Sequence, residues 1–422
     1  MEKLSGLPGS VPPPAPLPQP GLRRTFSVFR HRNFRIFWTG AFVSNIGTWM
    51  QSVAQGWLVL QLTNSAFLLG LTGFASSLPM LLLLLVGGVY ADRVERKKLL
   101  IGLQIALMSF AAVLATLTAL GVVEIWHVLL LSFLTGIAFA FNAPAYQSMI
   151  SELVERNELV NAIALNSTQF NLSRVIGPAL TGGLVAVGGL AVCFYANAVS
   201  FLAAIVALAS LRVPRVVRPE PPGIWDSLLE GLRYVRRRPR VKAILLSVAA
   251  ISVFAMPYAT MLPVFARDRL GLGPAGLGYL MSAAGLGAVT GALTLAARSP
   301  MPRRGANVLG GVALTALGVL GFSLAKTFWV AAAFLFLVGF AATSTVALCN
   351  SLIQELVTDE MRGRMMSMFG LAFMGVLPIG NLLAGTASKL VGPPAAFTIS
   401  GALLLGSAGA ITWLSPRLRV YS

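Results

Sequence analysis

The sequence predicts an all-α membrane protein in which twelve transmembrane helices form two six-helix halves related by a pseudo-two-fold axis. Three observations support this prediction: the composition, the spacing of the apolar runs and an internal repeat. Of the 422 residues, 56% are hydrophobic and only 11% are charged, and the mean hydropathy is +0.79. An average soluble domain has about 25% charged residues, which cover its surface with polar groups. The composition therefore excludes a soluble enzyme and makes lipid the main solvent.

The apolar runs have the length expected of membrane crossings. One crossing needs about 20 apolar residues, so a chain of this length has room for twelve crossings, loops and tails. Apolar runs between clusters of charge predict spans at 34–61, 66–91, 99–121, 125–150, 158–188, 190–211, 243–266, 273–297, 307–325, 327–352, 364–388 and 394–414. An even number of spans places both termini on one side of the membrane.

The basic residues indicate which side the termini occupy. The chain has 32 Lys and Arg against 14 Asp and Glu, a formal net charge of +18. Most cations lie on the side of the termini, whereas the opposite side has Arg267, Arg269, Lys326 and Lys389. Because cytoplasmic loops are enriched in Lys and Arg, both termini are expected on the cytoplasmic side of the membrane. The membrane itself is expected to be a bacterial inner membrane. The net positive charge is then explained by the orientation of the helices in the membrane, so no nucleic-acid partner is expected.

The spans divide the chain into five parts. We expect a disordered, Pro-rich cytoplasmic tail without a cleaved leader at 1–33, an N-terminal bundle at 34–211, a cytoplasmic linker at 212–242, a C-terminal bundle at 243–414 and a short tail at 415–422. Apolar residues recur at helical spacing in the linker: Ile224, Trp225, Leu228, Leu229, Leu232 and Val235. This pattern predicts an amphipathic helix on the inner leaflet.

The two halves repeat each other. Residues 151–183 align with 353–386, and one constant offset superimposes Glu152 on Glu355, Gly177 on Gly380, Gly182 on Gly385 and Gly189 on Gly392. These coincidences, at an offset of about half the chain, indicate an internal duplication. Duplicated bundles usually enclose a substrate path near the middle of the membrane.

A charged motif follows the second span. Gly88 comes four residues before Asp92, and the cations Arg93, Arg96 and Lys97 follow. Gly88 lets a neighbouring helix approach closely, and Asp92 can pair with Arg93 or Arg96 at the membrane edge. The motif resembles the signature of the major facilitator superfamily, whose loop clasps the two halves together in the outward-facing state. The resemblance implies that Asp92 and Arg96 form this clasp.

The clasp has a simpler alternative, which is ordinary flanking charge on the cytoplasmic side. The family usually has Gly where this chain has Glu95, and the corresponding second-half loop, ARSPMPRRG, lacks an acid. The charges after the tenth span are either the receiving end of the clasp or a solvated loop: Asp359, Glu360, Arg362 and Arg364.

A Gly-Pro element lies in the fifth span. Gly177, Pro178 and Gly182 resemble a motif of exporters in this superfamily, with one extra residue before the paired glycines. Proline kinks a helix and glycine admits a neighbour, so the segment is expected to bend or seal near the outer mouth, with tight packing alone as the alternative. More widely, residues 28–415 resemble enterobactin-exporter-like and macrolide-efflux-like members. This resemblance implies alternating-access export of a small amphipathic molecule, siderophore-like or drug-like, coupled to proton entry.

One cation, Arg174, lies inside a predicted span. An unpaired cation near the bilayer centre costs at least about 2.5–3.5 kcal/mol, so its side chain must face protein or water. Helical spacing places Ser167, Asn171 and Pro178 on the same face, and one face of the first span carries Asn45, Thr48, Ser52 and Gln55. Both stripes are expected to line the substrate cavity. The alternative is interhelical hydrogen bonding that only holds the bundle together.

The corresponding wall of the second half is apolar, because Leu377 and Met374 stand at the positions of Arg174 and Asn171. Such a cavity suits amphipathic cargo. A guanidinium attracts carboxylate, catecholate or phosphate groups, so neutral or anionic cargo is expected.

The coupling of transport to protons rests on the family resemblance, because no acid lies in the middle of a span. Glu152 or Glu155 could titrate when the inner gate opens, with solvated edge charge as the alternative. His127 is equally open to either interpretation.

Other classes of protein find little support in the sequence. The GxGxxG match at 271–276 follows no strand, and no nucleophile or zinc pattern occurs, so no cofactor, metal or enzymatic activity is expected. A nutrient importer of the same fold, or a lipid-moving or accessory membrane protein, stays an alternative. The cargo and the oligomeric state are open, with a monomer as the expectation.

Overall fold

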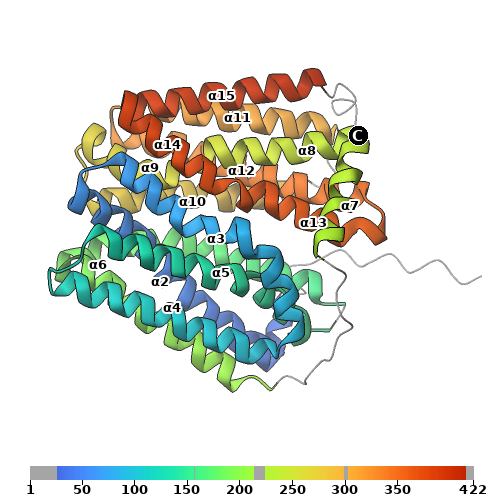
Figure 1. Cartoon of the computed structure of the whole chain (residues 1–422), viewed down its shortest axis with the longest axis horizontal. Coiled ribbons are helices and arrows are strands. Elements are labelled where there is room, and N and C mark those ends of the chain that lie inside the picture. Colours follow the sequence, from blue (N-terminus) through green and yellow to red (C-terminus); the bar gives the residue numbers. More distant parts are fainter. Residues whose placement is uncertain (1–25, 156, 213–223, 299–302, 415–422) are drawn as a thin grey trace, which may run out of the picture.

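The computed structural model describes residues 26–155, 157–212, 224–298 and 303–414, and no strand occurs among them. The helices lie side by side along the long axis of the molecule (Figure 1). The N-terminal half consists of η1 (Ser27–Arg30), α2 (Arg32–Thr63), α3 (Ala66–Arg93), α4 (Arg96–Ala119), α5 (Ile125–Leu153) and α6 (Leu159–Ser210). After α7 (Ile224–Arg237), the C-terminal half consists of α8 (Pro239–Ala250), η2 (Ile251–Ala255), α9 (Tyr258–Leu270), α10 (Pro274–Ala297), α11 (Arg304–Ser323), α12 (Phe328–Leu356), α13 (Asp359–Gly370), η3 (Leu371–Gly375), α14 (Leu377–Val391) and α15 (Pro393–Leu414).

Ten helical segments of the described residues are long and apolar enough to cross a membrane. One of them, α6, has 52 residues and leaves helical geometry at Gly188 and Gly189, so it divides into two rods. This break separates the predicted spans 158–188 and 190–211. Helix α2 is not among the ten, but its 32 residues exceed the length that a crossing needs. The described helices therefore accommodate twelve crossings, and that number stays a prediction.

The folded part of the chain begins earlier than the sequence suggested. The disordered tail was expected to reach residue 33, but Ser27–Arg30 form a 3-10 helix and Val28 is fully buried. Val28 belongs to an apolar cluster with Phe34 and Phe37 of α2, and its burial holds this segment against the bundle. Residues 1–25 of the predicted N-terminal tail and the tail at 415–422 lie outside the described residues.

Polar side chains define the helix ends at the end of the bundle away from the termini. The Ser65 hydroxyl caps α3 by accepting the Leu68 N–H at 3.3 Å. Glu124 and His127 form a reciprocal cap at the start of α5, in which Nδ1 of His127 accepts the Glu124 N–H at 3.0 Å. This contact gives His127 a structural role.

The internal repeat is preserved in the backbone. Gly189 follows the first rod of α6, and its counterpart Gly392 joins α14 to α15; their φ angles are 73° and 81°. This left-handed region strongly favours glycine. Both positions are reversals between consecutive rods, which explains why the two halves share a glycine there.

The other paired glycines make corresponding contacts. A Cβ on Gly177 would lie 2.5 Å from the Ile46 carbonyl oxygen of α2, and one on Gly380 would lie 2.7 Å from the Val253 carbonyl oxygen of η2. In each half the glycine therefore lets the later helix touch the backbone of the first one.

The two halves meet along two seams, one between α6 and α10 and one between α3 and α14, and Figure 1 shows the halves lying side by side. In the α6–α10 seam, a Cβ on Gly182 would lie 2.5 Å from Ala275 Cβ. In the α3–α14 seam, a Cβ on Gly385 would lie 2.8 Å from the Cα of Gly70. Gly182 and Gly385 are repeat partners, so the same backbone position forms both seams.

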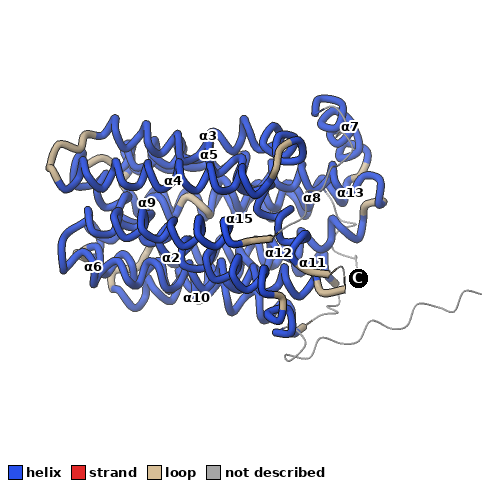
Figure 2. The backbone as a smooth tube through the Cα atoms, turned by 90° about the horizontal axis from the view of Figure 1, so that it is seen from below, coloured by secondary structure: helices blue, strands red, loops and turns tan. Residues whose placement is uncertain are grey.

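Helix α7 lies at the end of the bundle near the C-terminus, and its axis runs across the direction of the other helices (Figures 1 and 2). It occupies part of the predicted linker. Val235 is buried, and Gly231 packs against Met365 and Met368 of α13. Glu230 adds an ion pair with Arg364 at 3.0 Å. Part of the apolar face of α7 is therefore used against protein, not against the membrane.

Candidate functional site

Arg174 of α6 lies between the two halves of the molecule. Its guanidinium donates a hydrogen bond to Oη of Tyr258 on α9 at 2.9 Å. The same group lies over the Trp49 ring of α2, 5.5 Å from the ring centroid, and Phe170 meets that ring edge-on. Arg174 is half-buried and Tyr258 is buried. The intramembrane cation therefore faces aromatic rings and a hydroxyl of the protein, which replace part of its hydration.

No sequence pattern singles out Tyr258. It begins α9 directly after the π-helix η2 and Pro257, a segment where the regular helical hydrogen bonds are interrupted. A lone tyrosine in an apolar run has no periodic signal, and the neighbouring proline was the only local feature.

The other residues predicted on the face of α6 make local contacts. The Asn171 side-chain amide donates to the carbonyl oxygen of Ser167, one turn earlier in the same helix, at 2.8 Å. Ser167 is exposed and Asn171 is half-buried. These two residues lie near Arg174 in sequence, but their hydrogen bond stays within α6.

The polar stripe of α2 also does not converge on Arg174. Thr48 and Ser52 donate to carbonyl oxygens of their own helix, at 3.0 and 2.7 Å. The Gln55 amide donates to Oγ of Ser132 on α5 at 2.8 Å. Asn45 is half-buried and Ser52 is exposed. The Gln55 contact is interhelical hydrogen bonding within one half, as in the simpler of the two interpretations of this stripe.

A second polar cluster, missed by the sequence analysis, lies at the α3–α14 seam. The Thr260 hydroxyl donates to Oδ1 of Asn381 at 2.9 Å, and Nδ2 of Asn381 donates to the Ser77 hydroxyl at 3.4 Å. Asn381 and Ser77 are buried. This cluster joins α9 and α14 of one half to α3 of the other. Asn381 stands four residues after Leu377, the repeat partner of Arg174.

The Gly-Pro element packs tightly against the other half of the molecule. Within α6, non-helical dihedral angles occur at Gly188 and Gly189 and not at Pro178. A Cβ on Gly278 of α10 would lie 2.1 Å from the Pro178 carbonyl oxygen. The chain leaves helical geometry ten residues after Pro178, and the element itself provides close contact between the halves.

The charged motif after α3 organises the ends of three helices. Arg96 forms a buried ion pair with Glu152 at the end of α5. Lys97 donates to the carbonyl oxygens of Ala209 and Leu211 at the end of α6, at 2.9 and 2.7 Å. These cations complement the negative ends of two helices. All of these contacts lie within the N-terminal half.

The glycine of the motif that makes the close helix contact is not the one that the sequence predicted. A Cβ on Gly88 would meet nothing within 4 Å, whereas one on Gly87 would lie 2.4 Å from the Ala140 carbonyl oxygen. The close approach expected of Gly88 is therefore made by Gly87. Arg93 is exposed, and the side chain of Asp92 lies outside the described residues.

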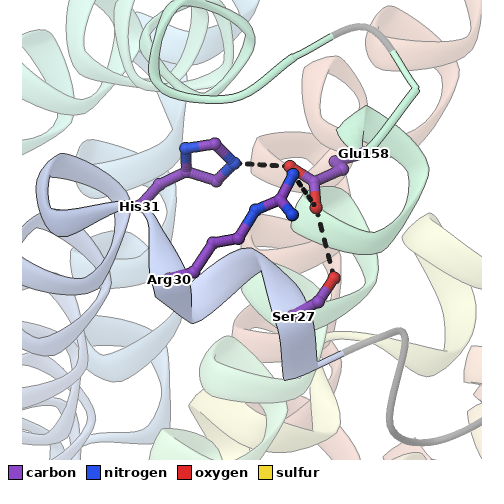
Figure 3. Close-up of polar contacts among 4 residues, drawn as sticks. All are labelled: Ser27, Arg30, His31 and Glu158. Atoms are coloured by element: carbon purple, nitrogen blue, oxygen red, sulfur yellow. Dashed lines mark hydrogen bonds and ion pairs between the residues drawn. The ribbon is translucent and has the colours of Figure 1, made fainter.

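A cluster around Glu158 lies at the start of α6 (Figure 3). His31 Nε2 lies 2.5 Å from Oε2 of Glu158, the Ser27 hydroxyl donates to Oε1 at 3.2 Å, and Arg30 pairs with Oε1 at 3.3 Å. Glu158 is buried, and it lines a cavity of about 320 Å³ together with Ser27, Arg30, Asn157 and Asn161. The hydrogen bond from His31 lowers the pKa of Glu158, against the opposing effect of burial. The cluster ties η1 and α2 to the start of α6.

Two halves of membrane-length helices, joined by glycine seams with Arg174 at their interface, define a polytopic membrane transporter. The chain matches the transmembrane secretion effector family over residues 23–421, and it belongs to that family. It is 27% identical over 384 residues to an enterobactin exporter of Shigella boydii, covering 89% of this chain and 90% of that protein. It is 24% identical over 380 residues to macrolide efflux protein A of Streptococcus pyogenes, covering 88% and 93%.

The fold also matches a solved transporter structure. A bacterial homologue of the human lysosomal transporter Spinster, in an inward-facing and unoccupied conformation, superimposes with a TM-score of 0.71 over 96% of this chain and all of that one, at 14% identity. These comparisons confirm the predicted family, the all-helical membrane fold and the prediction that the chain is a transporter and not an enzyme. The protein is a multi-pass membrane protein.

Proposed function

We propose that the protein exports a small amphipathic molecule, neutral or anionic and siderophore-like or drug-like, by alternating access between its two halves. The observation that carries the proposal is the position of Arg174, whose hydrogen bond to Tyr258 crosses from one half to the other. The named activities of the related enterobactin exporter and macrolide efflux protein support export.

The mechanism follows from this contact. While Arg174 is bound to Tyr258 and covered by Trp49, one N–H donor of its guanidinium is occupied and one face of the group is shielded. An anionic group of the cargo competes with the phenol, because a charged acceptor binds a guanidinium more strongly than a neutral hydroxyl does. Binding of cargo then weakens a contact between the halves, which favours the alternative arrangement.

The polar stripes belong to the same proposal. We propose that Ser167 and Asn171 of α6 line the substrate cavity together with Asn45, Thr48, Ser52 and Gln55 of α2. The cytoplasmic clasp is proposed to consist of Asp92 with Arg96, and to hold the halves together in the outward-facing state, at the end near the termini. Proton entry and a monomeric state complete the proposal, with both termini in the cytoplasm of a bacterial cell.

Export can be tested in inverted membrane vesicles that carry an imposed pH gradient. We expect them to accumulate fluorescent anionic or neutral amphipathic compounds, and Arg174→Gln to reduce anionic accumulation at least tenfold. Arg174→Lys should recover part of it, because lysine keeps the charge but not the planar fork. Tyr258→Phe is the matched control: it removes the phenol donor-acceptor group and leaves the guanidinium, so anionic cargo should still bind.

Equal accumulation by all three variants would assign Arg174 a structural role. Accumulation in right-side-out vesicles under the same gradient would instead indicate import. For the clasp, Asp92→Asn should impair turnover in a folded protein, and an unchanged rate would remove the clasp from the mechanism.

A further inference from the structure

Helix α7 has one face that packs on the protein. Val235 is buried, and a Cβ on Gly231 would lie 3.2 Å from Met368 Cγ of α13. Glu230 pairs with Arg364 of α13 at 3.0 Å. These contacts fix which way the helix is turned, and hence which side chains face outward.

The opposite face of α7 combines leucine with arginine. Leu229, Leu232, Arg233, Arg236 and Arg237 share one side of the helix, because each stands three or four residues from another member of the set, and all are exposed. The exposed fractions are 51% for Leu229 and 48% for Leu232. Among the described residues, none forms a hydrogen bond or ion pair with the side chain of Arg233, Arg236 or Arg237. The face is therefore amphipathic and has no partner within the described chain.

The placement of α7 matches a membrane surface. The helices of the bundle span its long axis, and α7 lies across one end of them (Figure 1). If the bundle crosses the bilayer, the axis of α7 runs along the plane of the headgroups. At that depth leucine side chains reach the acyl boundary while guanidinium groups meet lipid phosphates.

We propose that this face, formed by Leu229, Leu232, Arg233, Arg236 and Arg237, binds the headgroups of anionic lipids. The charge of the three arginines selects anionic over zwitterionic headgroups, and each arginine near such a surface strengthens binding about fivefold. A second copy of the chain is a poor occupant, because it would bring like charges together. Anionic lipid thus holds α7 in place and, through α13, anchors the linker side of the C-terminal half. The proposal requires the membrane location of the bundle and not the direction of transport.

Labelling of Leu229→Cys by a neutral, water-soluble maleimide tests the proposal. The two native cysteines, Cys193 and Cys349, are buried, so background labelling is expected to be low. The protein is reconstituted in nanodiscs of phosphatidylcholine alone, or of phosphatidylcholine with one-third phosphatidylglycerol. We expect the labelling rate to fall at least tenfold in the anionic discs. High salt should reverse much of this protection, because it screens the arginines.

A charge-neutralised background and a distant site give the controls. Arg233→Gln, Arg236→Gln and Arg237→Gln together should abolish the difference between the two lipids, and Val122→Cys at the far end of the bundle should show none. Equal labelling of Leu229→Cys in both lipids would overturn the proposal, as would protection that survives the triple substitution. Should the triple variant fail to fold, the salt dependence of protection in the intact background decides, and salt-independent protection contradicts the proposal.

Discussion

The two halves have glycine contacts at the same repeat positions but differ in the charged residues that they carry. Gly182 and Gly385 occupy the same repeat position and make both seams. At the same offset, Arg174 of the first half stands opposite Leu377, and buried Glu158 stands opposite buried Met361. Close helix approach is a requirement of the fold, so both halves keep it. Charge serves one site, and the first half alone has it at these positions.

One ion pair near the cytoplasmic end of each half joins corresponding helix ends, but the two pairs differ in how far they are buried. Arg96, at the start of α4, pairs with Glu152 near the end of α5, and Arg304, at the start of α11, pairs with Glu355 near the end of α12. The side chains of the first pair are 6% and 13% exposed, whereas those of the second are 23% and 48% exposed. Burial, more than the identity of the residues, therefore decides what each pair contributes.

The largest expected effect tests this difference in burial. Arg96→Gln should lower the free energy of unfolding by about 3–5 kcal/mol, because it leaves a buried carboxylate without its guanidinium. The matched substitution Arg304→Gln should cost about 0–1 kcal/mol, since water solvates the exposed partner. Thermal unfolding in detergent measures both. Equal losses would mean that the halves do not differ in this respect.

The seams can be compared by adding one methyl group. Gly182→Ala should cost about 1–3 kcal/mol and slow transport, because the new Cβ meets Ala275 at the α6–α10 seam. Its neighbour Gly183 is the control, as a Cβ there meets nothing within 4 Å. Gly183→Ala should leave turnover unchanged and raise stability slightly, because alanine favours the helix. Matching losses at both positions would contradict a role for the seam.

A smaller effect is expected at the uncharged polar cluster of the α3–α14 seam. Asn381→Ala removes the acceptor of the Thr260 hydroxyl, and should cost about 1 kcal/mol. Thr260→Val, which removes the other partner, should cost a similar amount, and the double variant should cost less than the sum. Strict additivity in unfolding measurements would show that the two residues do not interact.

The smallest effect concerns pH. The pKa of Glu158 lies below its ordinary value of 4.5, so the ionised carboxylate stabilises the fold. This contribution is present above pH 4.5 and is lost as the pH falls further, through the lowered pKa of the folded state. Glu158→Gln should therefore flatten the acid side of the stability profile. Glu155→Gln, at an exposed neighbouring acid, should leave the profile as it is, and identical profiles for the two variants would exclude the Glu158 cluster as the cause.

Much of the fold could be predicted from the sequence, because a bilayer constrains the length and polarity of each crossing. The break at Gly188 and Gly189 coincides with the boundary between two predicted spans. The membrane also explains why Arg174 could be singled out: a cation in an apolar run has to be accommodated by protein or water.

The partners of the site residues could not be predicted. Tyr258 lies 84 residues from Arg174 in the chain, His31 lies 127 residues from Glu158, and Ser77 lies 304 residues from Asn381. No local pattern joins positions so far apart. The side chains on a polar stripe share a direction, but only packing decides whether they bond within one helix, as Asn171 does.

The sequence by itself determined that this chain spans a membrane, that its halves are repeats and that glycine recurs where helices touch or turn. These properties follow from solvent transfer and backbone sterics, which act residue by residue. The tertiary structure alone decided that Arg174 meets Tyr258 and Trp49, that Arg96 is buried while Arg304 is not, and that α7 presents arginine outward. These facts depend on the distances between helices, and those are fixed by the packing of the whole bundle.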